Sequence, residues 1–180
     1  SIQSDGKIIV GGMFTYYNGT IINKIARLNT NGTLDTTFNP GSELNYNVST
    51  TSIQSDGKII VGIIFYTNLT GNDNYGITRR NANGSLDNSF AAPFNPWGLG
   101  STGSVTCSAI QNDGKILIGK IFKYSNSSTS YSIERLNANG TIDDSFASKN
   151  VNGPINTISI QSNGKIIFSG SFDQLNPNAG

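Results

Sequence analysis

Ile2-Gln3-Ser4-Asp5-Gly6-Lys7-Ile8-Ile9-Val10-Gly11 is the stretch that decides the fold, because the chain repeats it from Ile53, Ile110 and Ile160. A second stretch, Arg27-Leu28-Asn29-Thr30-Asn31-Gly32-Thr33-Leu34-Asp35-Thr36-Thr37-Phe38, is repeated from Arg79 and Arg135. We call these stretches the first and second phrases. The spacings are 51, 57 and 50 residues for the first phrase, and 52 and 56 for the second. A constant period of this length predicts a tandem array of similar structural units.

The first phrase is predicted to be a β-hairpin. A three-residue loop, Ser4 to Gly6, with the glycine in the left-handed conformation, pairs Gln3 with Lys7 and Ile2 with Ile8. Asp5 and Gly6 are therefore expected to be structural turn residues, as are their counterparts Asp56, Gly57, Asp113 and Gly114. The lysine that follows each turn is expected to form a solvated column: Lys7, Lys58, Lys115 and Lys165.

The second phrase predicts another hairpin. A loop of Thr30 to Gly32 sets Leu28 opposite Leu34 and Arg27 opposite Asp35, so that apolar and oppositely charged residues meet across the strands. The other copies give the same structural pairs: Arg79 with Asp87, Arg135 with Asp143, and Leu136 with Ile142. The middle copy departs at one position, because Arg80 faces Leu86.

These hairpins predict an all-β fold of four-stranded units, each of about 52 residues. Strands such as Ile8-Ile9-Val10 are apolar on both faces, as expected when each sheet lies between neighbouring copies. We interpret the units as β-propeller blades, three to four of them and part of a larger propeller, with a β-solenoid-like array as the alternative. The predicted boundaries are 1–46 for an N-terminally truncated repeat 1, 47–103 for repeat 2 with a longer connector, 104–153 for repeat 3, and 154–180 for a partial repeat 4.

The two phrases, I-Q-x-D-G-K-I-x-x-G-G-x-F and R-L-N-x-N-G-x-x-D-x-x-F, resemble the delta-60 repeat, a family of predicted β-propeller units in large bacterial and some viral proteins. The resemblance covers nearly the whole chain. It implies a surface-exposed or secreted scaffold without established enzymatic activity. The chain departs from the pattern at Ile63-Ile64 and Lys120-Ile121, compared with Gly11-Gly12 in the first unit, and at Asn163, where other copies have aspartate.

The composition argues against several classes of function. Twelve basic and eleven acidic residues nearly cancel and form no basic block, so we expect no nucleic-acid partner. No apolar run approaches the roughly 18 residues that a membrane span requires. The single cysteine, Cys107, allows no internal disulfide and is expected to be a buried strand thiol. The chain begins and stops inside repeats, which favours a piece of a longer protein.

We expect no catalytic site, cofactor or metal. The chain has no histidine, which removes the usual Ser-His and Cys-His nucleophiles. Six of the eleven acids belong to the repeated turns or the Arg-Asp pairs, and Asp144 adjoins the last pair, so a glycan-cleaving propeller ranks last. Asn29, Asn31 and Asp35 surround a glycine turn, but their spacing does not match a calcium loop, and side-chain bonds within the turn are the favoured interpretation.

Two variable regions are candidate binding sites. The segments after the second strand of each unit carry tyrosines and asparagines that a propeller would place on one rim: Tyr16, Tyr17, Asn18, Tyr66, Asn68, Tyr124 and Asn126. The connector after Phe90 is longer than its counterparts and contains Pro93, Pro96 and the only tryptophan, Trp97. Aromatic and amide groups there are suited to contact a protein or a sugar. The alternative is that they pack the loops against the next blade.

The sequence thus favours a non-enzymatic repeat scaffold of a secreted, cell-surface or virion-associated protein. Its expected role is protein-protein attachment or structural display, with other blades or chains of the same assembly, or a protein or glycan on a surface, as partners. The alternative is a carbohydrate-binding propeller that uses the tyrosine and tryptophan loops.

Overall fold

A computed structural model describes residues 1–41, 44, 46–66, 76–92, 102–124 and 127–176. These residues form fourteen β-strands and no helix, which confirms the all-β prediction. The strands are β1 (Ile8–Gly11), β2 (Tyr16–Tyr17), β3 (Thr20–Ile21), β4 (Ile25–Leu28), β5 (Val48–Ile53), β6 (Ile59–Tyr66), β7 (Ile77–Arg80), β8 (Thr102–Ile110), β9 (Ile116–Lys123), β10 (Thr129–Leu136), β11 (Lys149–Val151), β12 (Ile155–Ile160), β13 (Ile166–Gly170) and β14 (Leu175–Asn176).

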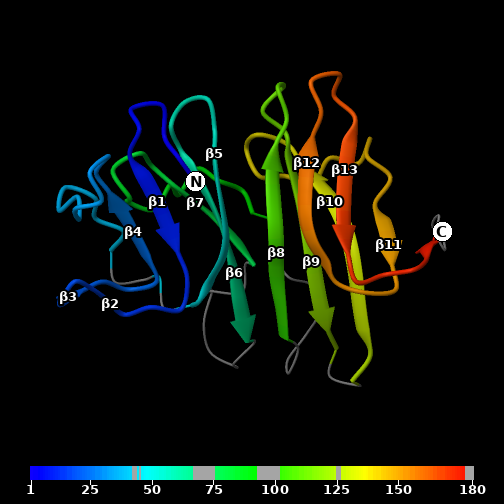
Figure 1. The fold of residues 1–180 in the computed structure, drawn as a ribbon. Helices are drawn as coiled ribbons and strands as arrows, with labels where there is room; N and C mark the ends of the chain where they lie inside the picture. The colour runs from blue at the N-terminus through cyan, green and yellow to red at the C-terminus, as the bar shows by residue number, and fades with distance from the viewer. Residues whose placement is uncertain (42–43, 45, 67–75, 93–101, 125–126, 177–180) are drawn as a thin grey trace.

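The strands fall into four successive units, which follow one another from left to right in Figure 1. Unit 1 contains β1 and β4, unit 2 contains β5 to β7, unit 3 contains β8 to β10, and unit 4 contains β12 and β13. The strands within each unit pair antiparallel in chain order. The first-phrase turns lie along the upper edge in Figure 1, while β1, β6, β9 and β13 all run toward the lower edge.

The register of the first-phrase hairpin confirms the sequence prediction. Ile2 bridges Ile8, and the Gln3 N–H donates to the Lys7 carbonyl at 2.8 Å. Gly6 has a φ of 82°, the left-handed conformation that a three-residue loop of this kind requires. Asn163 replaces the turn aspartate without altering the turn, because its Oδ1 accepts the Lys165 N–H at 3.1 Å as Asp5 does for Lys7.

The glycine of the strand that follows each first-phrase turn occupies the same position in units 1, 2 and 3, although the sequence comparison treated it as replaced in units 2 and 3. The strand registers place Gly62 and Gly119 at the position of Gly11, opposite an isoleucine of the third strand in each case. In units 2 and 3, only Gly12 is therefore replaced. This replacement accompanies a longer strand, since β1 ends at Gly11 while β6 and β9 continue to Tyr66 and Lys123.

The second-phrase hairpins have the predicted register but a shorter fourth strand. Leu28 bridges Leu34, and the same contact joins Arg80 to Leu86 and Leu136 to Ile142. The strand goes no further than this bridge because the chain turns at once. Asp35 Oδ1 accepts the Thr37 N–H at 3.0 Å, and the Phe38 N–H donates to the Asp35 carbonyl at 3.2 Å. In units 1 and 2 the predicted fourth strand is thus a single bridge followed by a turn. In unit 3 the chain returns after the turn as β11, which pairs antiparallel with β10, and β14 in turn pairs with β11.

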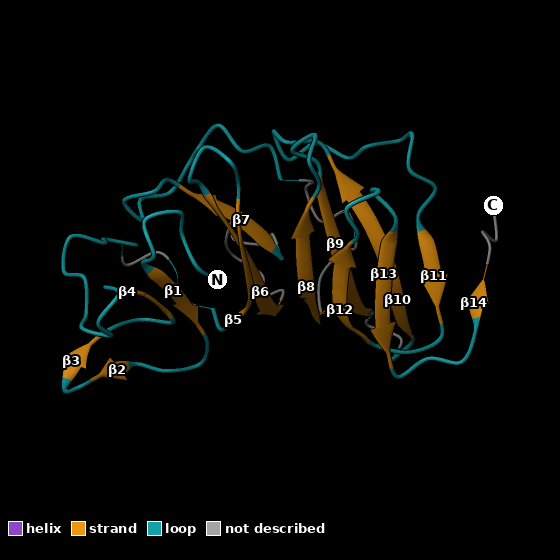
Figure 2. Ribbon diagram, turned by 45° about the horizontal axis from the view of Figure 1, so that its top comes forward, coloured by secondary structure: helices purple, strands orange, loops and turns teal. Residues whose placement is uncertain are grey.

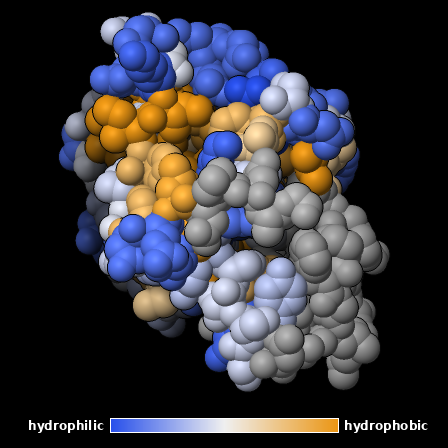
Figure 3. Space-filling model, turned by 90° about the vertical axis from the view of Figure 1, so that its right-hand side faces the viewer, coloured by the Kyte–Doolittle hydropathy of each residue, from blue (hydrophilic) through white to orange (hydrophobic). Residues whose placement is uncertain are grey.

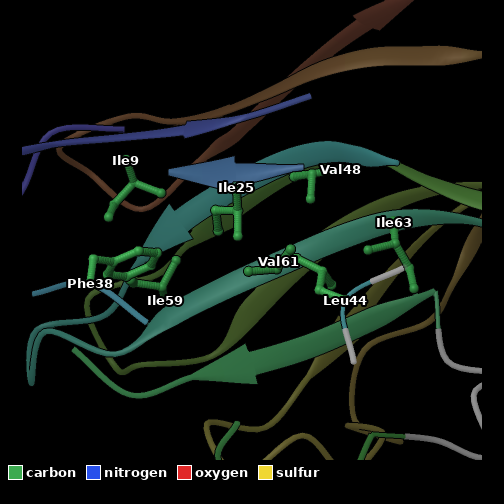
Figure 4. Packing of buried hydrophobic residues seen from close by; sticks show 8 residues of the cluster. All are labelled: Ile9, Ile25, Phe38, Leu44, Val48, Ile59, Val61 and Ile63. Carbon is green, nitrogen blue, oxygen red and sulfur yellow. The ribbon is translucent and has the colours of Figure 1, made fainter. Parts of the chain in front are cut away.

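Hydrophobic cores lie between consecutive units rather than within one. Ile9 and Ile25 of unit 1 pack with Ile59 and Val61 of unit 2, and Figure 4 shows these side chains pointing into the space between the strands. The adjacent Ile60 faces the other way, into the core that unit 2 shares with unit 3. A third core joins units 3 and 4. Alternate residues of one strand therefore serve two cores, which is why these strands are apolar on both faces.

The four units form an open array. Figures 1 and 2 show β1 at one side of the molecule and β11 and β13 at the other. Units 2 and 3 are joined by strand pairing as well as by their core, since Ile64 of β6 pairs with Ser104 of β8. In the part of the chain that the structure describes, no helix is long and apolar enough to cross a membrane.

Candidate functional site

The repeated charged residues form one cluster in each of units 1, 2 and 3. In unit 1, Asp35 Oδ2 accepts from Lys7 Nζ at 2.7 Å and from Arg27 Nε at 2.8 Å. The same arrangement joins Lys58, Arg79 and Asp87, and Lys115, Arg135 and Asp143, with distances of 2.7 to 2.9 Å. We call these sets the Lys–Asp–Arg clusters. The prediction of a solvated lysine column was therefore wrong for these three lysines.

Local bonds fix the aspartate of each cluster in its ionised form. Asp87 Oδ1 accepts the Ser89 N–H at 3.0 Å and the Ser89 hydroxyl at 2.6 Å, while Oδ2 binds the two cations. The Ser89 hydroxyl bond, followed by the Lys58 ammonium, holds the pKa of Asp87 well below its ordinary value, although burial opposes this shift. In unit 1, Lys7 and then Thr37 lower the pKa of Asp35 in the same way.

The arginines of the first two clusters reach the next unit. Arg27 Nη1 donates to the Ala82 carbonyl of unit 2 at 2.6 Å, and Arg79 Nη1 donates to the Ala138 carbonyl of unit 3 at 2.7 Å. Each guanidinium also lies over a phenylalanine of its own unit, 5.1 Å from the Phe38 centroid and 4.8 Å from that of Phe90. The clusters of units 1 and 2 therefore connect each unit to the next.

The one position at which the second phrase of unit 2 departs from the other copies provides another connection between units. Arg80 stands where Leu28 and Leu136 stand in the neighbouring units, and it is almost completely buried. Its Nη1 donates to the Pro40 carbonyl of unit 1 at 2.7 Å. Near it is a hollow of about 350 Å³ whose lining includes Tyr46 and Ile77.

The amide groups of the second-phrase turn are used within the turn. Asn31 Oδ1 accepts both the N–H and the hydroxyl of Thr33, at 3.1 and 2.7 Å. Asn29 Nδ2 donates to the Thr33 hydroxyl at 3.0 Å. These bonds explain why asparagine recurs at both positions. Among the described residues, no three His, Cys, Asp or Glu side chains come together as a metal site would require.

Tyr16, Tyr17 and Asn18 lie on the short β2–β3 hairpin, which projects from the lower edge of unit 1 in Figures 1 and 2. Asn18 and Gly19 have φ values of 46° and 81°, the conformation of a two-residue type I′ turn. The Tyr17 hydroxyl donates to the Gly32 carbonyl at 2.6 Å and so attaches the hairpin to the second-phrase turn of its own unit. Tyr17 therefore holds the hairpin to its own unit, whereas the alternative interpretation of the rim residues had the loops pack against the next blade.

The β2–β3 hairpin and the segment between β1 and β2 expose three large apolar side chains. Tyr16 is 63 % exposed and Ile21, its partner across the hairpin, is 70 % exposed, as is Met13. Beside Ile21 lies a hollow of about 330 Å³, whose apolar lining includes Leu34 and Phe38. An exposed aromatic and two aliphatic side chains next to a concave, partly apolar surface are features of a contact site. We call Met13, Tyr16 and Ile21 the hairpin patch. Sequence reasoning found its tyrosine but missed Met13 and Ile21.

The structure does not bring all predicted rim residues together. Tyr124 follows β9 on the same lower edge, but it lies in unit 3 and is half-buried against the ring of Phe122, at 4.9 Å in an edge-on contact. β2 and β9 stand well apart along this edge in both ribbon views. The side chain of Tyr66 lies outside the described residues, as do Asn68, Trp97 and Asn126.

Comparison with known proteins gives one match. A family model described as "Domain of unknown function (DUF5122) beta-propeller" matches residues 3–38, 54–90 and 111–146, which contain the three pairs of phrases except for the first isoleucine of each pair. Neither curated proteins nor solved structures gave a match. The three matched segments cover more than half of the chain. They begin and end within the repeated hairpins described above. The chain therefore belongs to this β-propeller family of unknown function.

Proposed function

We propose that this chain is a non-enzymatic scaffold of a secreted, cell-surface or virion-associated protein, and that it attaches to another protein through the hairpin patch. Its repeats would be delta-60 repeats within the β-propeller family. The three Lys–Asp–Arg clusters support the scaffold role, because their charged groups bind one another within a unit and the arginines of the first two also bind the backbone of the next unit. The repeated residues thus maintain the array, while residues outside the phrases are free to differ between units.

The exposure of the hairpin patch is the observation that carries the proposal. Burying Tyr16 and Ile21 against a partner would contribute about 25 cal/mol for each Å² of apolar area removed from water. The type I′ turn and the Tyr17–Gly32 hydrogen bond hold the hairpin in one conformation before binding. A rigid hairpin loses little conformational entropy when it binds, so it favours attachment over transient contact.

A photo-crosslinking residue at position 16 tests this proposal on surface preparations from the source. We expect adducts with a defined protein, and we expect Ile21→Ser to remove them. The matched control places the crosslinking residue at position 162 instead. Ser162 is an exposed residue of the turn between β12 and β13, and this turn lies at the edge of the array opposite to the β2–β3 hairpin. Equal adducts from positions 16 and 162, or none from position 16, would contradict attachment through the hairpin patch.

Carbohydrate binding is the second candidate, and the exposed ring of Tyr16, with the exposed Asn18 two residues further along the same hairpin, favours it. A sugar would stack on the aromatic face and bond to the amide, whereas a protein partner would depend on the aliphatic members of the patch. Tyr16→Ala should then remove binding on a glycan array, while Ile21→Ser should leave most of it. An array without hits would eliminate this candidate.

A further inference from the structure

The chain contains six asparagine–glycine pairs, and one of them differs from the others in its hydrogen bonds. The pairs begin at Asn18, Asn31, Asn83, Asn139, Asn152 and Asn163. An Asn-Gly pair deamidates when the backbone nitrogen of the glycine attacks the side-chain amide carbon of the asparagine. Glycine has no Cβ to hinder this approach. The attack is fast only where the nitrogen and the amide carbon can come together without first breaking other contacts.

Three of the pairs lie in second-phrase turns, and each turn binds both reacting groups. In unit 1 the Gly32 N–H donates to the Asn29 carbonyl at 2.8 Å. Asn31 Oδ1 accepts the N–H and the hydroxyl of Thr33, at 3.1 and 2.7 Å. The second-phrase turns of units 2 and 3 repeat these bonds. The glycine nitrogen must lose its proton to solvent before it attacks, so its hydrogen bond has to open first, as in amide hydrogen exchange.

The pairs on either side of β12 are held as well. After β12, the Gly164 N–H donates to the carbonyl three residues before it at 2.9 Å, and Asn163 Oδ1 accepts the Lys165 N–H at 3.1 Å. Before β12, Asn152 uses both ends of its amide. Its Nδ2 donates to Asp173 Oδ1 at 2.6 Å, and its Oδ1 accepts two backbone N–H groups at 3.1 and 3.2 Å. These amides therefore cannot turn toward the glycine without losing hydrogen bonds.

Exposure to solvent does not distinguish the six pairs. Asn31, Asn152 and Asn163 are exposed, as Asn18 is. Figure 3 views the side of the molecule on which β12 and β13 lie and shows hydrophilic residues along its upper edge, where the turn between these strands lies. Water therefore reaches the bonded pairs too, and the hydrogen bonds of each pair are what distinguish one from another.

The pair Asn18–Gly19 has neither kind of bond. It forms the two-residue turn of the β2–β3 hairpin, between Tyr17 and Thr20, which pair across the strands. Among the described residues, the Gly19 N–H donates to no acceptor and the Asn18 side chain makes no hydrogen bond. Both residues are exposed. The amide of Asn18 can therefore rotate toward the Gly19 nitrogen without breaking a hydrogen bond.

We propose that Asn18 is the site at which this chain deamidates, and that the reaction releases the β2–β3 hairpin. The Gly19 nitrogen bonds to Asn18 Cγ, its proton passes through solvent to Nδ2, and the Cγ–Nδ2 bond breaks to release ammonia. The product is a cyclic imide. Water then opens the ring. Breaking the bond between the nitrogen and Cγ gives aspartate, and breaking the bond between the nitrogen and the backbone carbonyl carbon gives isoaspartate. Each conversion consumes one water and releases one ammonia.

Both products change the hairpin patch. A carboxylate replaces a neutral amide between Tyr16 and Ile21, two exposed members of the patch. Isoaspartate also directs the backbone through the former side chain and so lengthens the loop. A two-residue loop in the type I′ conformation is what pairs Tyr17 with Thr20, so the longer loop should end this pairing. The consequence for attachment rests on the function proposed above, whereas the reaction at Asn18 does not.

Peptide mapping by mass spectrometry of the chain, incubated in mildly alkaline buffer, tests the site with the other pairs as internal controls. Asn18 should convert about thirtyfold faster than Asn31, Asn83 and Asn139, because at least two hydrogen bonds must open before any of these three reacts. Thr33→Val removes one bond to Asn31 and should speed conversion there about fivefold, without changing the rate at Asn18. In urea, which unfolds the chain, the rates should become similar. The proposal is overturned if Asn18 is not the fastest site in the folded chain, or if its lead persists in urea.

Hydrogen exchange tests the release of the hairpin. The incubated chain should exchange faster than fresh chain at residues 16–21 and equally at residues 166–170. Asn18→Gly is the control, because a glycine pair also forms a type I′ turn but has no amide to react, and incubation should leave its exchange unchanged. Equal exchange at residues 16–21 before and after incubation would overturn the release.

Crosslinking from position 16 then separates this inference from the proposed function. Adducts that fresh chain forms and incubated chain loses would support control of attachment by deamidation. Equal adducts from both chains would overturn that control and leave attachment standing. Absence of adducts from both would contradict attachment, while the mass-spectrometric rates would still decide the deamidation site.

Discussion

Asp87 shows how much of the array depends on a single side chain. It binds Lys58 and Arg79 through one carboxylate oxygen and Ser89 through the other. Asp87→Asn keeps the shape but removes the charge that both cations face, so we expect the free energy of unfolding in urea to fall by about 2–3 kcal/mol. Asp144→Asn, at an exposed position next to the unit 3 cluster, serves as the control and should change it by less than about 0.5 kcal/mol. Equal effects of the two substitutions would contradict this role.

The lowered pKa of the cluster aspartates predicts how the free energy of unfolding changes in acid. The pKa values of Asp35 and Asp87 lie well below the ordinary value of 3.8, so the unfolded state binds more protons than the folded state once the pH falls below that value. Their stabilisation is complete above this range and is lost as the pH falls toward their folded-state pKa. We expect unfolding free energies to change little from pH 7 to 5 and to decline below about pH 4. Asp87→Asn should make this decline shallower, and an unchanged slope would contradict the assignment.

Gly62 allows two units to approach each other closely. A Cβ at this position would lie 2.5 Å from Thr50 Cγ2 and 3.0 Å from Val105 Cγ1. Gly62→Ala should therefore destabilise the chain by about 1–3 kcal/mol through overpacking, measured by thermal and urea unfolding. Adding Thr50→Ala removes the nearest methyl and should recover part of that loss. No recovery would show that the glycine is required for another reason.

At the scale of one element, the β2–β3 hairpin depends on Tyr17 for its position. Tyr17→Phe removes the hydroxyl that donates to the Gly32 carbonyl while keeping the ring. We expect a loss of about 1 kcal/mol in global stability and faster hydrogen exchange at residues 16–21. Tyr16→Phe is the matched control, because Tyr16 is exposed, and it should leave exchange in this segment unchanged.

The hairpins were predictable from the sequence because each is decided by a local rule. A three-residue loop with a left-handed glycine fixes the pairing of Ile2 with Ile8 and of Leu28 with Leu34. The length of the fourth strand was overestimated. Asp35 pairs with Arg27, but it also accepts a hydrogen bond from the Thr37 N–H, and this bond turns the chain away from the strand. Local pairing rules describe one hairpin at a time, so they did not reveal this competition.

The role of the lysines could be predicted only from the register between the two hairpins of a unit. β1 pairs with β4 so that Ile9 lies opposite Arg27, which places Lys7 on the same face as Arg27 and one step along it. Once this register is known, the contact from Lys7 to Asp35 follows. Met13 and Ile21 of the hairpin patch were missed for a different reason. They lie outside the repeated phrases, where only the folded structure shows which side chains are exposed.

At the scale of the whole molecule, stability comes from the interfaces between units. Each of the three cores takes residues from two neighbouring units, and the cluster arginines add hydrogen bonds across the first two interfaces. A protein of this kind gains stability from nearest-neighbour contacts, so weakening one interface should separate the unfolding of the parts on either side.

Arg79 and Arg135 allow the contribution of one interface contact to be measured directly. Each arginine binds its own aspartate, lies over its own phenylalanine, and is near a glutamine of its own unit. The difference is that Arg79 also donates to the Ala138 carbonyl of the next unit. Arg79→Met should therefore destabilise the chain more than Arg135→Met does, by the roughly 1.5–3 kcal/mol of a hydrogen bond from a charged group.

A sharper measurement is to find which units lose stability in each variant. In hydrogen exchange, Arg79→Met should let units 1 and 2 open separately from units 3 and 4, while Arg135→Met should leave the coupling of units 2 and 3 intact. Partial urea unfolding that becomes biphasic only for Arg79→Met would agree with this. If the two substitutions cost the same free energy and the same regions lose protection, the arginine does not couple the units, and the shared hydrophobic cores alone hold the array together.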